Sequence, residues 1–270
     1  MEINVDLCTH ILTNFIAEET KKVGFHNVIV GLSGGVDSAL STKLATIALG
    51  RSNVFAYILP YRLSNKENID DAVYFAKQLG INYEVIDITQ IADPYLSLNS
   101  DITNIRTGNV LARLRMVILF DKSVQHKGLV LGTSNKTELL LGYGTWYGDM
   151  ASSINPIGDL YKTQVWQLGE YMNIPMKILQ KAPSADLWLG QTDEGEIGYT
   201  YKEIDRLLYY MVDQRMNFNK LLGLGFKEDM INKIKEMIRK SQYKRQLPVI
   251  AKISLRTIDK DFRYCRDWGY

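Results

Sequence analysis

A glycine-rich segment between a short apolar run and a helix-period run is the part of this chain best suited to chemistry. Its residues are Gly31, Leu32, Ser33, Gly34, Gly35, Val36, Asp37 and Ser38. Glycines let the backbone approach a polyphosphate without Cβ clashes, and the first N–H groups of the following helix point at the anion. The segment therefore predicts a site for the phosphates of a nucleotide.

Asp37 adds a requirement, because its charge would repel bound phosphates unless a hard cation lay between them. Neither the lysine-containing Walker A pattern nor the dinucleotide pattern G-x-G-x-x-G occurs in the chain. The alternative interpretation is a glycine-rich turn in which Asp37 and Ser38 only cap a helix. The acid favours Mg²⁺, and the loop resembles that of the ATP pyrophosphatases, which cleave ATP to AMP and pyrophosphate.

A second carboxylate is expected at the same place. Glu138 follows Thr133 closely, just past a predicted strand at 129–131. It can complete a capping box with Asn135 or bind a metal ion, and its position beside Asp37 favours the second role. Two carboxylates there would hold one Mg²⁺ against a triphosphate and stabilise the departing pyrophosphate.

Two further groups of residues leave their interpretation open. A polar stripe on a predicted helix at 103–125 either faces solvent or grips an anion, and it consists of Arg106, Asn109 and Arg113. An aromatic group is either core or a stacking wall for a heteroaromatic ring, and it consists of Tyr143, Trp146 and Tyr147.

Alternating strands and helices must position these side chains. We expect an α/β fold with a doubly wound parallel sheet and C-terminal helices. Ligands bind such sheets at the carboxyl ends of the strands, where the winding order reverses, so the loops after strands one, two and four should share one crevice. The stretch 182–198 has little periodicity, and a loop of this length is usually functional or disordered. The family resemblance given below implies that it is a mobile lid. The predicted strands are 28–30, 54–59, 83–86 and 129–131. The predicted helices are 2–22, 36–49, 64–79 and 103–125, with one more from Asn135 and several over 201–240. A Ser64/Glu67 capping box is expected to open the helix at 64–79.

Composition limits the class of protein. The 270 residues carry a net charge of +2, which demands neither a nucleic acid nor an anionic membrane as partner. The two cysteines, Cys8 and Cys265, form no metal-binding pattern and suggest a reducing compartment. No stretch approaches the roughly 20 apolar residues that span a bilayer. We expect one domain over 1–270, cytoplasmic, with no nucleic-acid or membrane partner.

The succession of further motifs resembles one family, the ammonia-dependent NAD synthetases. The resemblance implies the doubly wound fold of the adenine nucleotide α-hydrolases, a homodimer, and conversion of deamido-NAD, ATP and ammonia to NAD, AMP and pyrophosphate through an adenylated nicotinate carboxylate. The motifs are Asn-x-x-Ala-Arg-x-Arg-Met at 109–116, Gly-Thr-Ser-Asn-Lys-Thr-Glu at 132–138, Gly-Tyr-Gly-Thr-Trp-Tyr-Gly-Asp at 142–149, Asn-Pro at 155–156, Leu-Tyr-Lys-Thr at 160–163, Pro-Ser-Ala-Asp-Leu at 183–187 and Gly-Gln-x-Asp-Glu at 190–194.

The same resemblance assigns roles to single residues. Asp149 matches an acid near the ammonia position and is a candidate general base. Trp146 and Ser153 stand where many members have a lysine and an aspartate that hold deamido-NAD, and Trp146 could replace a charged contact by stacking. ATP contacts fall on residues 31–38, Arg62, Thr133, Lys162 and Ser184; Mg²⁺ ligands on Asp37 and Glu138; deamido-NAD contacts on Asn109, Arg113, Tyr143, Tyr243 and Lys244.

Rival functions remain at this point. One is another adenylating ATP pyrophosphatase, such as a tRNA-modifying or GMP-forming amidotransferase subunit, and the other is a module that senses ATP without turning it over. Asp37, Glu138 and Lys162 together favour turnover. The chain has no room for an amidase domain, so free ammonia or a separate ammonia-supplying protein is the expected nitrogen source. The helix at 103–125 is the first candidate for a dimer surface.

Overall fold

A parallel four-stranded sheet organises the chain, whose computed structural model describes residues 1–184, 192–246 and 248–258. The strand order is β3-β2-β1-β4, and every neighbouring pair is parallel. The winding order therefore reverses between β1 and β4, which confirms the predicted doubly wound α/β fold. The strands are β1 (Asn27–Gly31), β2 (Val54–Ile58), β3 (Asn82–Val85) and β4 (Gly128–Leu131).

The two central strands are short because each consists of little more than a buried apolar run. Val28, Ile29 and Val30 of β1 have no exposed surface, as expected for a strand covered on both faces. Val30 pairs with Leu131 of β4, and Gly31 pairs with Tyr57 of β2. This register brings the glycine loop, the loop after β2 and the loop after β4 to one edge of the sheet.

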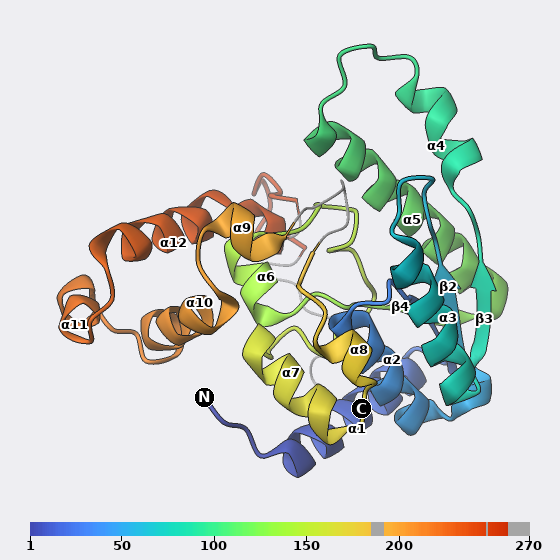
Figure 1. Ribbon diagram of the computed structural model, residues 1–270, viewed down its shortest axis with the longest axis horizontal. Coiled ribbons are helices and arrows are strands. Elements are labelled where there is room, and N and C mark those ends of the chain that lie inside the picture. The colour runs from blue at the N-terminus through green and yellow to red at the C-terminus, as the bar shows by residue number, and fades with distance from the viewer. Residues whose placement is uncertain (185–191, 247, 259–270) are drawn as a thin grey trace.

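Helices cover both faces of the sheet (Figure 1). On one face, alternate strand residues pack with a helical layer in the largest apolar cluster. On the other face, the remaining strand residues pack with the long helix α5 and with α4. The first layer comprises α1 (Val5–Lys22), α2 (Val36–Leu49), α3 (Lys66–Leu79), α7 (Lys162–Tyr171) and α8 (Met176–Leu179), and the second comprises α4 (Thr89–Leu96) and α5 (Asn104–His126).

The C-terminal helices form a unit beside the sheet, in orange to the left of Figure 1. They pack with α6 around a separate apolar cluster that includes Ile204, Leu207 and Ile231. The predicted helical region 201–240 is thus confirmed. This region contains α10 (Tyr201–Leu208), a π-helical turn (Tyr209–Asp213), α11 (Phe218–Gly223) and α12 (Glu228–Lys240). The remaining helices are α6 (Lys136–Leu141) and α9 (Asp193–Ile197), and 3-10 turns elsewhere in the chain occupy Arg51–Asn53 and Gln242–Arg245.

Several local expectations need correction. Asn65, not Ser64, caps α3, because its side chain accepts from the Glu67 amide while the Ser64 hydroxyl accepts from the amide of Tyr61. The short helix α4 has no counterpart among the predicted elements, since its Pro94 interrupts a helical pattern.

The expected lid at 182–198 is not a loop throughout. Residues 193–197 form α9, which is capped by Thr192, and residues 185–191 lie outside the described part of the chain. Among the described residues, none of the helices is both long enough and apolar enough to cross a membrane.

Gly34 is a position at which the backbone requires glycine. Its φ is +84°, and a Cβ built there would stand 2.2 Å from the carbonyl oxygen of Asn68. We expect Gly34→Ala to lower the free energy of unfolding by at least about 2 kcal/mol, from strained backbone and steric overlap together. Urea unfolding checks this, with Gly35→Ala as control because its Cβ would meet nothing nearer than the Ser33 hydroxyl at 3.4 Å. Equal losses in the two variants would contradict the explanation.

Candidate functional site

A pocket of about 580 Å³ opens at the carboxyl ends of β1, β2 and β4. All residues of the 31–38 loop except Gly34 line it. Pro60 and Ser64 contribute from the loop after β2, and Thr133 and Ser134 contribute from the loop after β4. The common crevice predicted from the strand order is therefore present.

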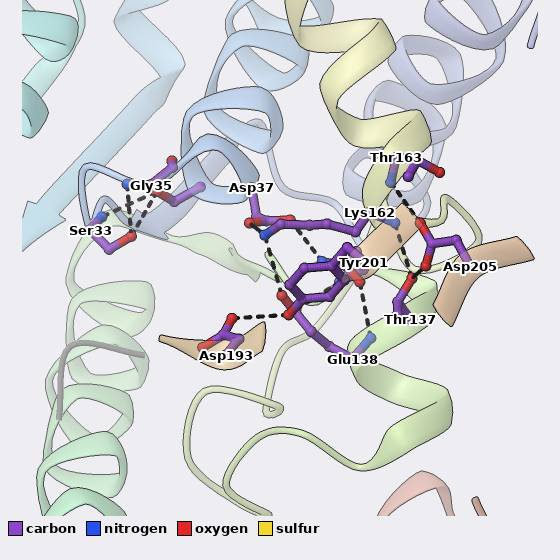
Figure 2. A network of polar contacts seen from close by, with 12 residues as sticks. Ser33, Gly35, Asp37, Thr137, Glu138, Lys162, Thr163, Asp193, Tyr201 and Asp205 are labelled. Atoms are coloured by element: carbon purple, nitrogen blue, oxygen red, sulfur yellow. Dashed lines mark hydrogen bonds and ion pairs between the residues drawn. The ribbon is translucent and has the colours of Figure 1, made fainter. Parts of the chain in front are cut away.

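A buried lysine and two carboxylates form the polar centre of this pocket (Figure 2). The Lys162 ammonium contacts Asp37 Oδ2 and lies 3.6 Å from Glu138 Oε1, and the lysine side chain is only 4% exposed. Asp37 lies in the first turn of α2, Glu138 lies in α6 and Lys162 is the first residue of α7. Three helices distant in sequence, α2, α6 and α7, therefore each contribute one charged side chain to this cluster.

Asn135 shows how the sequence places both acids. Its side chain caps α6 by accepting from the Glu138 amide at 3.0 Å, and its Nδ2 donates to Asp37 Oδ1 at 2.8 Å. Glu138 Oε2 accepts in return from the Asn135 amide at 3.2 Å, so the capping box is real. The other oxygen, Oε1, faces Lys162, which leaves the carboxylate able to serve both of the roles considered from sequence.

The electrostatics of this cluster favour a further cation. Burial and the neighbouring Asp37 raise the pKa of Glu138 to about 8, against the opposing pull of Lys162. Burial alone would lower the pKa of Lys162, but Asp37 and Glu138 raise it above its ordinary value, so the ammonium stays charged. A cation between the two acids would stabilise the ionised form of Glu138.

These donors fit Mg²⁺ shared with a nucleotide. Within the described residues, no group of three or more histidine, cysteine, aspartate or glutamate side chains could hold a metal ion. Mg²⁺ is commonly bound by one or two carboxylates together with substrate phosphates, rather than by a complete protein cage. Asp37 and Glu138 supply such a pair beside the glycine loop.

Hydroxyl groups hold the glycine loop in shape. The Ser38 hydroxyl donates to the Gly35 carbonyl at 3.0 Å and accepts from the Ser33 amide at 3.2 Å. The Ser33 hydroxyl accepts from the Gly35 amide at 3.3 Å and meets Ser38 Oγ at 3.1 Å. The loop is therefore folded before any anion arrives, which lowers the entropic cost of binding one.

A second set of predicted residues also lines the pocket: Asn109, Tyr143, Asp149, Ser184 and Lys244. Thr145 connects two of them, because its hydroxyl donates to Asn109 Oδ1 at 2.8 Å and its amide donates to Asp149 Oδ1 at 2.7 Å. Burial raises the pKa of Asp149, although the Thr145 amide and the nearby Lys244 oppose this. Lys244 donates to the carbonyls of Gly142 and Gly144, each at 2.8 Å, and burial lowers its pKa.

Other predicted residues lie outside the pocket lining, and their roles remain predictions. Arg62 is 59% exposed and pairs with Asp93 at 2.9 Å. Arg113 Nε donates to the Trp146 carbonyl at 3.2 Å. The Ser153 hydroxyl accepts from the β4 amide of Val130 at 3.3 Å.

The aromatic group divides between two environments. Tyr143 lines the pocket and packs against the C-terminal cluster. The Trp146 ring stacks on Tyr147 with centroids 4.4 Å apart and meets Tyr243 edge-on at 5.2 Å. Since Tyr147 and Tyr243 are exposed, this stack is a surface feature and not core.

The structure adds residues that sequence reasoning missed. Lys181 lines the pocket and donates to Asn68 Oδ1 and Asp71 Oδ2 at 2.7 and 2.6 Å. Asp193 also lines it and accepts from the Tyr201 hydroxyl at 2.9 Å. Lys181 directly precedes the stretch 182–198 and Asp193 lies within it, where no periodicity singles out individual side chains.

Comparison with known proteins places this geometry in context. A sequence model described as NAD synthase matches residues 8–248. An NH(3)-dependent NAD(+) synthetase of Trichlorobacter lovleyi is 54% identical over 269 residues, 100% of this chain and 98% of that protein. Among solved structures, an NMN synthetase from Francisella tularensis has a TM-score of 0.83 at 33% identity. An NH3-dependent NAD synthetase from Campylobacter jejuni, in complex with the nitrate ion, has a TM-score of 0.79 at 34% identity. Each comparison covers 93% of this chain and 100% of the solved one.

The raised pKa of Glu138 makes stability depend on pH. Because the pKa rises from 4.5 to about 8 on folding, the folded protein holds a proton that the unfolded chain releases, and stability falls as pH rises through this window. The glutamine in Glu138→Gln has no titratable proton, so this loss of stability is absent from the variant. In metal-free buffer, the melting temperature of the variant minus that of the wild type should therefore increase between about pH 5 and about pH 8.5. Thermal melts with EDTA measure the difference, and a difference independent of pH would contradict the assignment.

Proposed function

The chain belongs to the NAD synthase family, and we propose that the pocket beside its glycine loop is where the family reaction takes place. This chain is an enzyme that amidates deamido-NAD with ammonia, using ATP, and gives NAD. The sensing module and the other ATP pyrophosphatases are therefore set aside as functions. The observation that supports the pocket assignment is the buried contact of Lys162 with Asp37 and Glu138, next to a preformed phosphate loop.

We infer that the reaction runs in two steps. A nicotinate carboxylate is a poor electrophile, so a carboxylate oxygen of deamido-NAD first attacks the α-phosphorus of ATP. The bond from that phosphorus to the bridging oxygen breaks, and pyrophosphate leaves while the substrate becomes an acyl adenylate. Backbone N–H groups of the 31–38 loop and the Lys162 ammonium would stabilise the negative charge on the departing group. Mg²⁺ held by Asp37 and Glu138 would supply Lewis-acid stabilisation of that same charge.

The second step transfers nitrogen. Ammonia attacks the acyl carbon, the bond to AMP breaks, and one proton must leave the nitrogen. Two observations support Asp149 in this role: it lines the pocket, and its pKa is raised. The Thr145 amide orients this carboxylate by donating to its Oδ1 at 2.7 Å.

NMN formation is the second candidate reaction, because one of the similar solved structures carries the name NMN synthetase. The two reactions share the same chemistry and differ in whether the acceptor carries an adenylate half. Relatives that are 54% and 48% identical to this chain are named NH(3)-dependent NAD(+) synthetases, which favours the dinucleotide. The surface stack of Trp146, Tyr147 and Tyr243 beside the pocket could support either acceptor by stacking.

The remaining proposals concern assembly and location. We propose a homodimer with α5 at its surface, because this helix exposes Val117 and Val124 at 66% and 79%. The cytoplasmic location and a separate ammonia-supplying protein stay predictions from the sequence. So do the single-domain extent over 1–270 and a closing movement of the 182–198 segment.

The activity and its acceptor can be tested together. Purified protein with ATP, Mg²⁺, ammonium and deamido-NAD should form NAD, AMP and pyrophosphate in equal amounts. Replacing deamido-NAD by nicotinate mononucleotide should reduce kcat/KM, and EDTA should abolish turnover because the carboxylate pair then holds no metal. Chromatographic quantification of the nucleotides measures all products. A higher kcat/KM for the mononucleotide would reverse the choice of acceptor.

Replacement of Asp149 separates the two steps. In Asp149→Asn the amide oxygen still accepts from the Thr145 amide, so the pocket keeps its shape, but the proton acceptor is lost. We expect amide formation to slow about 100-fold or more, the usual scale of general-base catalysis, while the initial release of pyrophosphate stays within about threefold. Rapid-quench measurement of both products checks this. Equal slowing of both steps would reject the general-base role.

A further inference from the structure

Asp205 is a buried acid that lies behind the pocket and does not line it. It belongs to α10 in the C-terminal unit and has no exposed surface. Both of its oxygens are engaged, since Oδ1 accepts from the Thr137 hydroxyl at 2.6 Å and Oδ2 accepts from the Thr163 amide at 2.8 Å. A fully buried carboxylate is costly unless such bonds satisfy it, so the residue needs an explanation.

The bonds of Asp205 lead directly to the charged centre of the pocket (Figure 2). The Thr137 hydroxyl donates to Asp205 and accepts from the backbone amide of Lys162 at 3.0 Å. Lys162 and Thr163 are the first residues of α7, so one carboxylate fixes both of their amides, the first through Thr137. Thr137 also directly precedes Glu138 in α6.

The same face of α10 supports the other end of Lys162. Tyr201 lies one turn before Asp205, and its ring centre is 5.4 Å from the Lys162 ammonium. The backbone of Lys162 is thus held by Asp205, while its charged end lies over Tyr201. A negative charge at the start of α7 also suits the helix dipole.

We propose that Asp205 is a positioning residue that sets the separation between the Lys162 ammonium and the Glu138 carboxylate. It does so by joining the start of α7 to α6 through Thr137. The role rests on the proposed function, because it matters only if these two groups bind the metal and the phosphates of ATP. Groups that orient metal ligands or anion-binding side chains contribute about 10- to 100-fold to affinity or rate, and a shift of 1 Å can cost about 100-fold.

The test uses Asp205→Asn in the full chain. Asparagine has the same shape, but its NH₂ group must face either the Thr163 amide or the Thr137 hydroxyl, so at least one of the two bonds is weakened or lost. We expect the kcat for AMP formation to fall about 10- to 100-fold and the Kd for Mn²⁺, measured by electron paramagnetic resonance with a non-hydrolysable ATP analogue, to rise by about tenfold. Both are measured well below the midpoint of thermal unfolding, so that all protein is folded.

Thr137 provides an independent pair of variants in case Asp205→Asn does not fold. Thr137→Val removes the bridging hydroxyl and should shift the Mn²⁺ affinity and kcat in the same direction. Thr137→Ser keeps the hydroxyl and should restore most of both. A merely structural role would change the melting temperature without a matched change in Mn²⁺ affinity.

Glu203→Gln is the matched control on the same helix. Glu203 caps α10 by accepting from the Thr200 amide at 2.9 Å, and within the described part of the chain it makes no hydrogen bond to α6 or α7. This variant should lose a little stability and keep the wild-type Mn²⁺ affinity and kcat.

The proposal is overturned if a folded Asp205→Asn protein binds Mn²⁺ and turns over as the wild type does. It is also overturned if Thr137→Ser is as impaired as Thr137→Val, or if Glu203→Gln matches the loss. A wild-type protein that binds Mn²⁺ and the ATP analogue but forms no NAD would count against the proposed function instead, and the affinity comparison would still decide the role of Asp205.

Discussion

The burial of the Lys162 ammonium between two carboxylates is the constraint on which the rest of the site depends. A cation taken out of water costs several kcal/mol unless acids pair with it, and acids taken out of water need donors in turn. Asp37 receives Lys162 and Asn135, and Glu138 receives the backbone of its own capping box. These contacts require three helix starts, those of α2, α6 and α7, to lie side by side, whatever the conformation of the loops between them.

The proximity of these three helix starts explains why the site suits a nucleoside triphosphate. Helix starts present free N–H groups and positive dipole ends, and the doubly wound sheet brings them to one edge. The carboxylates would prevent anion binding there unless a divalent ion joined them to the phosphates. The charge arrangement therefore favours a metal-bound nucleotide. The residues proposed to contact the acceptor, Asn109, Tyr143 and Lys244, line the same pocket.

The sequence was most informative where the chemistry is local. The glycine loop, its flanking strand and helix, and the carboxylate after β4 are each encoded by a few consecutive residues, and their order resembles a family whose fold and activity the comparisons support. Long-range contacts were not predictable in this way. Asp205 reads as an ordinary polar position of an amphipathic helix, and only the packing of α10 shows that it reaches α7.

Local ambiguity explains other misses. Ser64 and Asn65 are both good helix caps, and which one serves depends on the turn before them. The Arg62 side chain is held by its ion pair with Asp93 in α4. The sequence of α4 gives only a weak helical signal, because Pro94 lies inside it. The Trp146 stack illustrates the same limit, since residue type predicts that aromatic rings associate but not whether they do so inside or outside.

The apolar cluster of the C-terminal helices is separate from the two clusters on the sheet, yet α10 places Tyr201 against Lys162 and Asp205 against the start of α7. Such units commonly open and close as cooperative blocks with a free energy below that of global denaturation. Transient undocking of this block would expose Lys162 to water while the sheet remained intact. Activity would then be lost in mild denaturant before the β-structure unfolds. The fraction of active enzyme would be set by the local unfolding equilibrium of this block and not by the global free energy of unfolding.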